Sequence, residues 1–194
     1  MKKIIIIMLL FISGLSVAQT EIDSYPSSNE DSYILLGSAY YYYVGQSFIG
    51  KAGTLTQAKF YLMKDGSPTG SSTAYLYAHT GTFGTNGTPT ETPIATSNSK
   101  SVSSVSNSIT QYTFTFVTPP TLVEGTEYVI VIKFTGGNES NYLLVTRDGT
   151  LPTHNGNLST STNGSSWSAV STQDLIFSVY GNIVNGFIPF ITID

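Results

Sequence analysis

Strict alternation of apolar and other residues is the main pattern along this chain, and its period of two is that of a β-strand. Nine segments show it, the first four most clearly: 73–79, 112–117, 126–134 and 175–180, then 33–36, 44–49, 55–63, 93–102 and 141–146. The segment 126–134 is apolar on both faces, which predicts burial on both. After the N-terminal segment, no window combines a helical period with capping residues. The pattern predicts an all-β fold, a jelly-roll-like antiparallel two-sheet β-sandwich.

The connecting segments are rich in turn-forming residues. Asp65–Gly70 joins two predicted strands, and Pro119 and Pro120 end another because proline donates no ladder hydrogen bond. No internal repeat or linker divides the chain, so residues 19–181 are predicted to form one domain. The longest irregular stretch, 147–171, has the length of a functional loop.

Residues 1–18 have the features of a signal peptide. Lys2 and Lys3 precede an apolar run from Ile4 to Ile12, and small residues end the segment at Ala18. The apolar run is too short to span a bilayer comfortably. We therefore expect Sec-dependent export from a bacterial cell, a mature protein that starts at Gln19, a secreted or cell-surface location, and no membrane insertion.

Charge and cysteine content exclude several classes of function. Without the first 18 residues the chain carries 6 basic and 12 acidic side chains, whereas a nucleic-acid binder needs a basic face. The chain has no cysteine, so disulfides, zinc–thiolate sites and cysteine nucleophiles are excluded.

The C-terminal segment 182–194 is apolar and carries a turn signal at Asn185-Gly186. It is predicted to fold back as an edge strand, a position where Pro189 is tolerated. The alternative is that it pairs with another chain, which would make it a route to self-association.

Several segments in a fixed order resemble bacterial and phage extracellular jelly-roll domains of the "choice-of-anchor" type, and are similar to carbohydrate-binding-module sandwiches. They are Gln46–Phe48, Ala52–Thr56, Gly66–Gly70, Ile94–Ser97, Tyr112–Phe116, Leu122–Tyr128, Ser165–Trp167, Asp174–Phe177 and Val179–Gly181. The resemblance covers roughly residues 40–181 and implies the fold. It implies no catalytic residue, because these motifs are structural.

The residues give little support for catalysis. His79 and His154 are the two histidines, and no Gly-x-Ser-x-Gly motif is present. Most carboxylates stand beside turn residues. We therefore expect no enzyme activity and no cofactor apart from a possible structural Ca²⁺, for which Asp65, Asp148 and Asp174 are the candidate ligands.

Candidate ligand-binding residues gather between positions 141 and 167. They combine aromatic, amide and charged side chains: Tyr142, Arg147, His154, Asn155, Asn157 and Trp167. An aromatic surface bordered by polar groups is a common way to bind a sugar. In the alternative interpretation, Trp167 caps the core and Arg147 pairs with Asp148 or Glu139.

Two further aromatic segments are candidates for exposed surfaces. Tyr75, Tyr77 and His79 share the predicted solvent face of one strand, where the tyrosines either bind a ligand or stabilise the sheet as cross-strand pairs. The run 40–43 consists of four tyrosines, of which alternation would expose two.

Taken together, these features favour a non-catalytic exported binding module that engages glycans or cell-surface polymers. The alternative is a structural protein of a surface layer, fibre or virion, in which the tyrosine run and the tail make the contacts between subunits.

Overall fold

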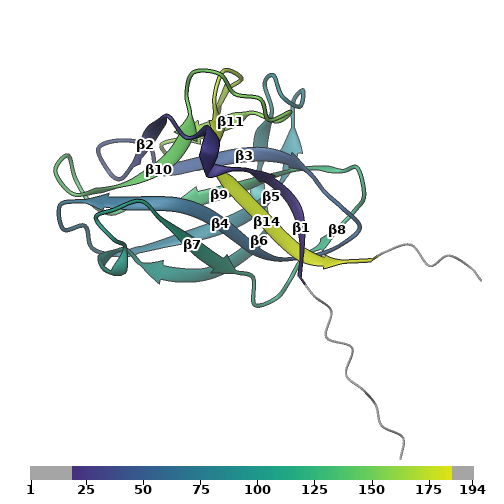
Figure 1. Ribbon diagram of the computed structural model, residues 1–194, viewed down its shortest axis with the longest axis horizontal. Helices are drawn as coiled ribbons and strands as arrows, with labels where there is room; N and C mark the ends of the chain where they lie inside the picture. The colour runs from purple at the N-terminus through teal and green to yellow at the C-terminus, as the bar shows by residue number, and fades with distance from the viewer. Residues whose placement is uncertain (1–18, 185–194) are drawn as a thin grey trace, which may run out of the picture.

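The computed structural model describes residues 19–184, which form two antiparallel β-sheets that pack face to face (Figure 1). The two-sheet β-sandwich predicted from the alternation is confirmed. The predicted signal peptide, residues 1–18, lies outside the described residues, and so does the segment 185–194, which is most of the predicted tail.

Eight strands make the first sheet, and six make the second. The first contains β1 (Thr20–Tyr25), β2 (Ser32–Leu36), β4 (Gly53–Asp65), β7 (Thr110–Thr115), β8 (Thr121–Leu122), β10 (Tyr142–Asp148), β13 (Asp174–Leu175) and β14 (Phe177–Ile183). The second has the order β12 (Ser168–Val170), β11 (Leu158–Ser161), β3 (Tyr43–Ile49), β9 (Glu127–Lys133), β5 (Ser71–Thr80) and β6 (Thr88–Ser101). Two short 3₁₀ turns, η1 (Ser27–Asn29) and η2 (Val102–Ser104), complete the described elements.

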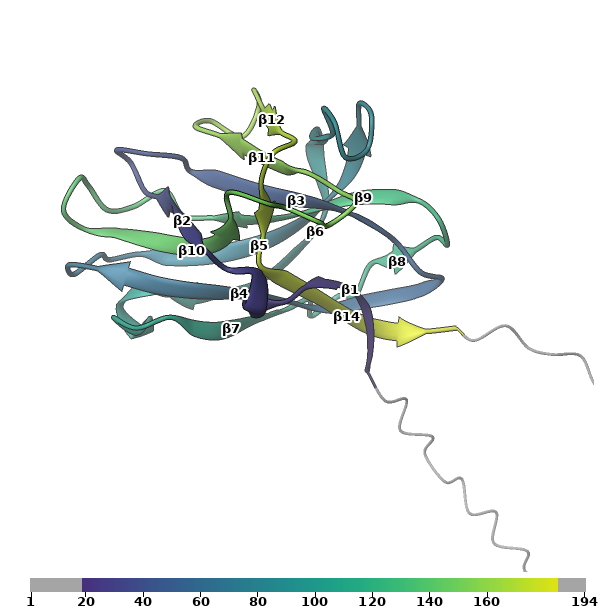
Figure 2. The same cartoon turned by 45° about the horizontal axis from the view of Figure 1, so that its top comes forward.

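Strand β4 organises the first sheet. It pairs with β14 and β10, and also with β7 and β8, so that four strands depend on its register (Figure 2). Its alternation of buried and half-buried positions shifts at Thr56, the residue that the pairing with β14 skips. This β-bulge keeps Leu55 and Phe60 both on the core face although they are five positions apart.

The two ends of the domain are hydrogen-bonded neighbours. Strand β1 pairs with β14, with Thr20 opposite Gly181 (Figures 1 and 2). Strand β14 continues to Ile183, so the predicted domain boundary at residue 181 falls inside a strand. The first two residues of the predicted tail therefore belong to the sheet.

Side chains from both sheets fill one continuous core between the layers. Phe60 of β4 and Phe114 of β7 pack edge to face with their ring centroids 6.0 Å apart, and both are fully buried. On β9, Ile130 and Ile132 face this core while Val131 is buried on the opposite face. The prediction that this segment is buried on both faces is confirmed.

All nine segments predicted from the alternation contain strands, and the segment 175–180 is divided at Ile176 into the end of β13 and the start of β14. Four short strands were not predicted: β1, β8, β11 and β12. The stretch 147–171 is therefore not a continuous irregular loop, because β11 and β12 form a hairpin inside it that extends the second sheet beside β3. Two irregular segments remain, 149–157 and 162–167, and each is flanked by a strand at both ends.

We expect Phe60→Ala to lower the free energy of unfolding by about 3–5 kcal/mol, because it empties a fully buried aromatic site in the central strand. Val117→Ala is the control, since Val117 is largely exposed and its loss should change stability by about 0.5 kcal/mol or less. Urea denaturation of both variants measures the difference. Equal effects of the two substitutions would contradict the assignment of the core.

Candidate binding site

The predicted ligand-binding residues separate into three places. Tyr142 and Arg147 lie on β10 of the first sheet, and Trp167 stands just before β12 of the second sheet. His154, Asn155 and Asn157 lie in the loop that joins β10 to β11. The structure therefore does not assemble the aromatic and polar residues of 141–167 into one surface.

Trp167 packs on the outer face of the second sheet. Its ring meets Tyr43 and Tyr77 edge to face, at centroid distances of 5.8 and 6.1 Å. The cluster covers Val129 and Val131, which are fully buried on the outer side of β9. This packing favours the alternative in which Trp167 is a capping residue, although it caps a small outer cluster and not the main core.

The face predicted to be open at Tyr75, Tyr77 and His79 is largely closed. Tyr77 is 4% exposed and the His79 side chain only 2%. The Nδ1 atom of His79 lies 2.8 Å from a carboxylate oxygen of Glu127. Burial lowers the pKa of His79, although Glu127 opposes the shift. These residues belong to the packing of the sheet, and the prediction of a solvent face was wrong for Tyr77 and His79.

Asn157 is a buried clamp between loops. Its Nδ2 donates to the carbonyl oxygens of Gly87 and Leu158 at 2.9 and 3.0 Å, and its Oδ1 accepts from the Gly87 amide at 3.2 Å. The backbone amide of Asn157 donates to Ser47 Oγ on β3 at 2.8 Å. Both amide hydrogens of the side chain and its oxygen are used inside the fold, so this residue holds the loops in place and offers a ligand nothing.

The three carboxylates considered for calcium do not form one site. Asp148 and Asp174 are opposite each other on β10 and β13, whereas Asp65 pairs with Tyr142 at the other end of β10. Asp65 accepts a 2.7 Å hydrogen bond from the Tyr142 hydroxyl. Within residues 19–184, no group of three or more His, Asp or Glu side chains is arranged to hold a metal ion.

Asp148 and Asp174 instead serve a buried polar network. The Tyr25 hydroxyl donates to Asp148 at 2.6 Å, and Gln46 Nε2 donates to Asp174 at 2.8 Å. The backbone amide of His154 donates to the second oxygen of Asp174 at 3.1 Å. These bonds connect β1 to the end of β10, and they connect β3 and the loop that follows β10 to β13.

The network also fixes the imidazole of His154. Its Nδ1 accepts from the Gly156 amide at 3.0 Å and lies 3.2 Å from Gln46 Nε2. Since Nδ1 is an acceptor, the neutral ring carries its hydrogen on Nε2, which faces Asp23 Oδ2 at 3.3 Å. Both ring nitrogens are engaged within the fold.

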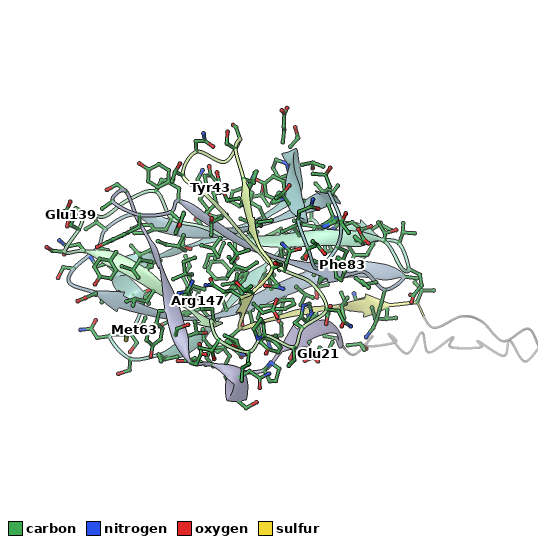
Figure 3. The ribbon with its side chains drawn as sticks, turned by 90° about the horizontal axis from the view of Figure 1, so that it is seen from above. Glu21, Tyr43, Met63, Phe83, Glu139 and Arg147 are labelled. Atoms are coloured by element: carbon green, nitrogen blue, oxygen red, sulfur yellow. The ribbon has the colours of Figure 1, made fainter. Side chains whose placement is uncertain are left out.

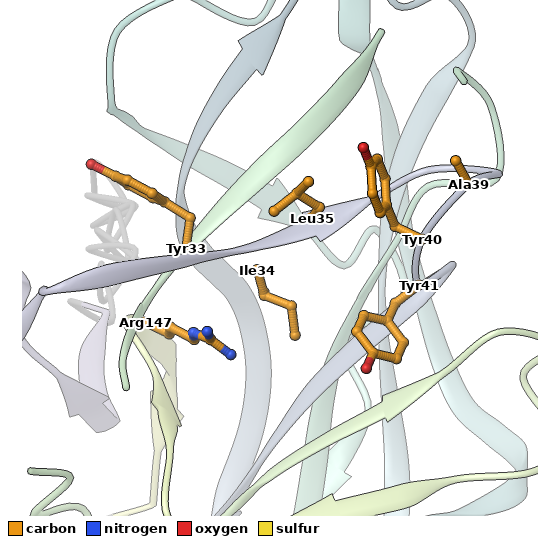
Figure 4. A pocket seen from close by; sticks show the side chains of 7 residues that line it. All are labelled: Tyr33, Ile34, Leu35, Ala39, Tyr40, Tyr41 and Arg147. Carbon is orange, nitrogen blue, oxygen red and sulfur yellow. The ribbon is translucent and has the colours of Figure 1, made fainter. Parts of the chain in front are cut away.

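An open cleft of about 580 Å³ runs along β2, and we call it the Tyr–Arg cleft. It is lined by Tyr33, Ile34, Leu35, Ala39, Tyr40, Tyr41 and Arg147. Figure 4 shows Arg147 and Tyr41 on one side of the β2 ribbon with Ile34 between them, and Tyr33 and Tyr40 on the other side. Tyr33 and Tyr41 are 37% and 40% exposed, so both rings are accessible from solvent.

The chain after β2 turns back on itself to form one wall of this cleft. The Gly37 amide donates to the Tyr41 carbonyl at 2.9 Å, and Gly37 has a φ of +155°, a value that disfavours other residues. Tyr40 packs edge to face on Tyr142 at 5.2 Å, which places the predicted residue Tyr142 behind the wall of the cleft. The four consecutive tyrosines thus diverge, and Tyr43 joins the Trp167 cluster instead.

Arg147 is the only arginine of the chain, and it forms no salt bridge within residues 19–184. In the described part of the protein no carboxylate lies within 4 Å of its guanidinium, so the predicted pairing with Asp148 or Glu139 is not formed. Its Nε donates to Ser32 Oγ at 3.2 Å and its Nη1 donates to Gln173. These two neutral partners orient the guanidinium, and Ser32 also donates to Asp31, so that this carboxylate is linked to Arg147 through a hydroxyl group and not by a direct ion pair.

Sequence reasoning missed Tyr33 and Asp23 as residues that line pockets. Tyr33 was part of a predicted strand, and its exposure follows from the position of β2 at the edge of the first sheet, where β10 is its one partner strand. Asp23 lies in β1, whose short and mostly polar sequence gave no strand signal.

Comparison with family models, with curated proteins and with solved structures gave no significant match for this chain. The resemblance to extracellular jelly-roll modules therefore remains a prediction. Within residues 19–184, the structure contains no helix with the length and apolar character needed to cross a membrane.

The pH dependence of stability tests the buried network. Burial raises the pKa of Asp174 above 3.8, although hydrogen bonds from Gln46 and His154 oppose the shift. The folded state then binds this proton more tightly than the unfolded state, so the contribution of Asp174 is largest below pH 3.8 and is lost as pH rises through the folded pKa.

We expect Asp174→Asn to remove this dependence. The free energy of unfolding of the natural protein, minus that of the variant, should fall as pH rises from about 3.8, the unfolded value. Urea denaturation of both proteins across the acidic range to neutral pH measures it. A difference that stays flat or rises with pH would contradict the role of burial at this carboxylate.

Proposed function

We propose that this protein is an exported, non-catalytic binding module that engages glycans or cell-surface polymers through the Tyr–Arg cleft. The observation that carries the proposal is an open cleft lined by three tyrosines and by an arginine that forms no direct salt bridge in the described residues. Export rests on the signal-peptide features of residues 1–18.

The chemistry of the cleft suits a sugar ring. The flat face of Tyr41, on the same side of β2 as Arg147, offers apolar area for the C–H face of a pyranose, and tyrosine loses little conformational entropy when it is held. The guanidinium of Arg147 presents several N–H donors in a fixed plane, which suits hydroxyl and carboxylate oxygens. A few placed polar groups beside an apolar surface are typical of ligand sites.

The non-catalytic part of the proposal is supported by the state of the groups that would do chemistry. A general base needs a free nitrogen or oxygen within reach of a substrate proton. Both ring nitrogens of His154 already contact groups of the fold, which are Gly156 and Gln46 at Nδ1 and Asp23 at Nε2. Asp174 accepts from Gln46 and from the His154 backbone amide. In the Tyr–Arg cleft, no carboxylate or imidazole is among the lining residues.

A glycan array probed with the mature protein tests the proposal, with Tyr41→Ala and Arg147→Gln as the site variants. Each should weaken binding about tenfold, which corresponds to about 1.4 kcal/mol, because each removes one of the groups that contact the ligand. Lys59→Gln is the control, since it removes the same charge on β4, outside the cleft.

Three results would contradict the proposal. Silence of the array together with self-association in solution would favour the assembly role in a surface structure. Binding that both cleft variants retain in full would place the glycan site elsewhere. Equal loss in Lys59→Gln would show a general charge effect in place of a contact made by Arg147.

A further inference from the structure

A second pocket lies at one end of the sandwich, and we call it the His–Asp pocket. Its volume is about 320 Å³, and its walls come from β1 and η1, from the end of β3, from the loop 81–87 and from the loop 149–157. Its lining includes Asp23, Asn29, Ile49, Phe83, His154 and Asn155. Figure 3 shows Phe83 well apart from Arg147, so this pocket is separate from the Tyr–Arg cleft.

The walls of the His–Asp pocket are fixed before any ligand arrives. Asn157 ties Gly87 to the loop that carries His154 and Asn155. Gly84 has a φ of +72°, and a Cβ at this position would collide with the carbonyl oxygen of Asn155. The loop that carries Phe83 therefore packs directly on the loop that carries Asn155. A ligand can bind without the entropy cost of ordering either loop.

Unused polar groups converge on this pocket. The side-chain amides of Asn29 and Asn155 have no hydrogen-bond partner among residues 19–184. The Asp23 side chain is 27% exposed; its Oδ1 accepts from the Ser24 amide, and its Oδ2 faces His154. Each carboxylate oxygen has two lone pairs, so Asp23 keeps acceptor capacity toward the pocket.

An apolar wall completes the site. Phe83 is half-buried against His79, with ring centroids 5.8 Å apart, and Ile49 is 44% exposed. An aromatic face, two free carboxamides and a carboxylate offer hydroxyl groups both donors and acceptors, and they offer a C–H face an apolar surface.

Charge and size narrow the ligand further. Asp23 is the one carboxylate in the lining, and no lysine or arginine stands beside it to attract an anion. The volume is at the small end of ligand pockets, which run from about 300 to 1,000 Å³, so one ring fits and a chain of rings does not.

From these observations we infer that the His–Asp pocket is a second binding site, which takes a single neutral, hydroxyl-rich ring such as one hexose unit. The inference does not rest on the Tyr–Arg cleft, because the two sites share no lining residue. The ligand stacks on Phe83, and its hydroxyl groups bond to Asp23 and Asn155.

Nuclear magnetic resonance titration of the mature protein tests the inference. The probes are the methyl glycosides of glucose, galactose and mannose, with methyl glucuronide as the anionic counterpart, all at millimolar concentration. At least one neutral glycoside should shift the amide signals of Gly84 and Asn155 and leave those of Tyr33 and Tyr41 in place. The glucuronide should bind more weakly than the matching glucoside because Asp23 repels it.

Variants then assign the contacts. Asn155→Ala and Asp23→Asn should each weaken binding at least tenfold, whereas Asn107→Ala, which removes an exposed amide elsewhere, should leave it unchanged. Melting temperatures check that each variant is folded, and Asn155→Ala is the decisive one because its side chain has no partner in the fold.

Four results would overturn the inference. They are no shift with any neutral glycoside, shifts confined to the Tyr–Arg cleft, full binding by folded Asn155→Ala, and a glucuronide that binds as well as the glucoside. The first result leaves the glycan proposal for the Tyr–Arg cleft standing, because the array tests that cleft with its own variants.

Discussion

The end of the sandwich that carries the His–Asp pocket depends on a network of buried polar side chains. Gln46, Ser47, Asn157 and Asp174 are almost completely buried at this end, where a β-sandwich would usually place apolar residues. A buried polar group that lacks a partner costs about 1–3 kcal/mol, so each of these groups must be paired in the folded state. Some of the partners lie in the loops 81–87 and 149–157, so this requirement also fixes the positions of those loops.

The network explains why the loops act as walls. Gln46 donates to Asp174, and Asp174 also accepts from the His154 backbone amide. Asn157 links the loop 81–87 to the loop 149–157. Tyr25 reaches from β1 to Asp148, so the first strand is also attached to this end. With these loops held, Asn155 and Asp23 face the same pocket, and no large rearrangement is needed to form it.

The sequence predicted the fold well where side chains alternate between core and surface. The nine long or strongly patterned strands were predicted, whereas β11 was not, because all four residues of Leu158–Ser161 are buried and three of them are small and polar. Burial of serine and threonine on both faces gives no period of two. The short β1 was missed for a related reason, since Glu21, Asp23 and Ser24 are polar.

The candidate site was less predictable, because it depends on which sheet each strand joins. Tyr142 and Trp167 are close in sequence, but β10 belongs to the first sheet and the hairpin that carries Trp167 extends the second. Arg147 and Asp148 do not pair because β10 continues through both residues, and neighbouring residues of a strand point to opposite faces, whereas the sequence predicted that this strand ends at residue 146. His154 and Asn155, two of the predicted ligand-binding residues, line the His–Asp pocket together with Asp23, which is distant from them in sequence.

Hydrogen exchange of the Asn157→Ala variant tests most directly whether the buried network holds the binding end in place. The account predicts that amide protection falls in residues 82–87 and 153–158, where the clamp acts, while β4 and β9 keep the protection of the natural protein. Unchanged protection in both loops, or an equal loss across the whole sandwich, would contradict it.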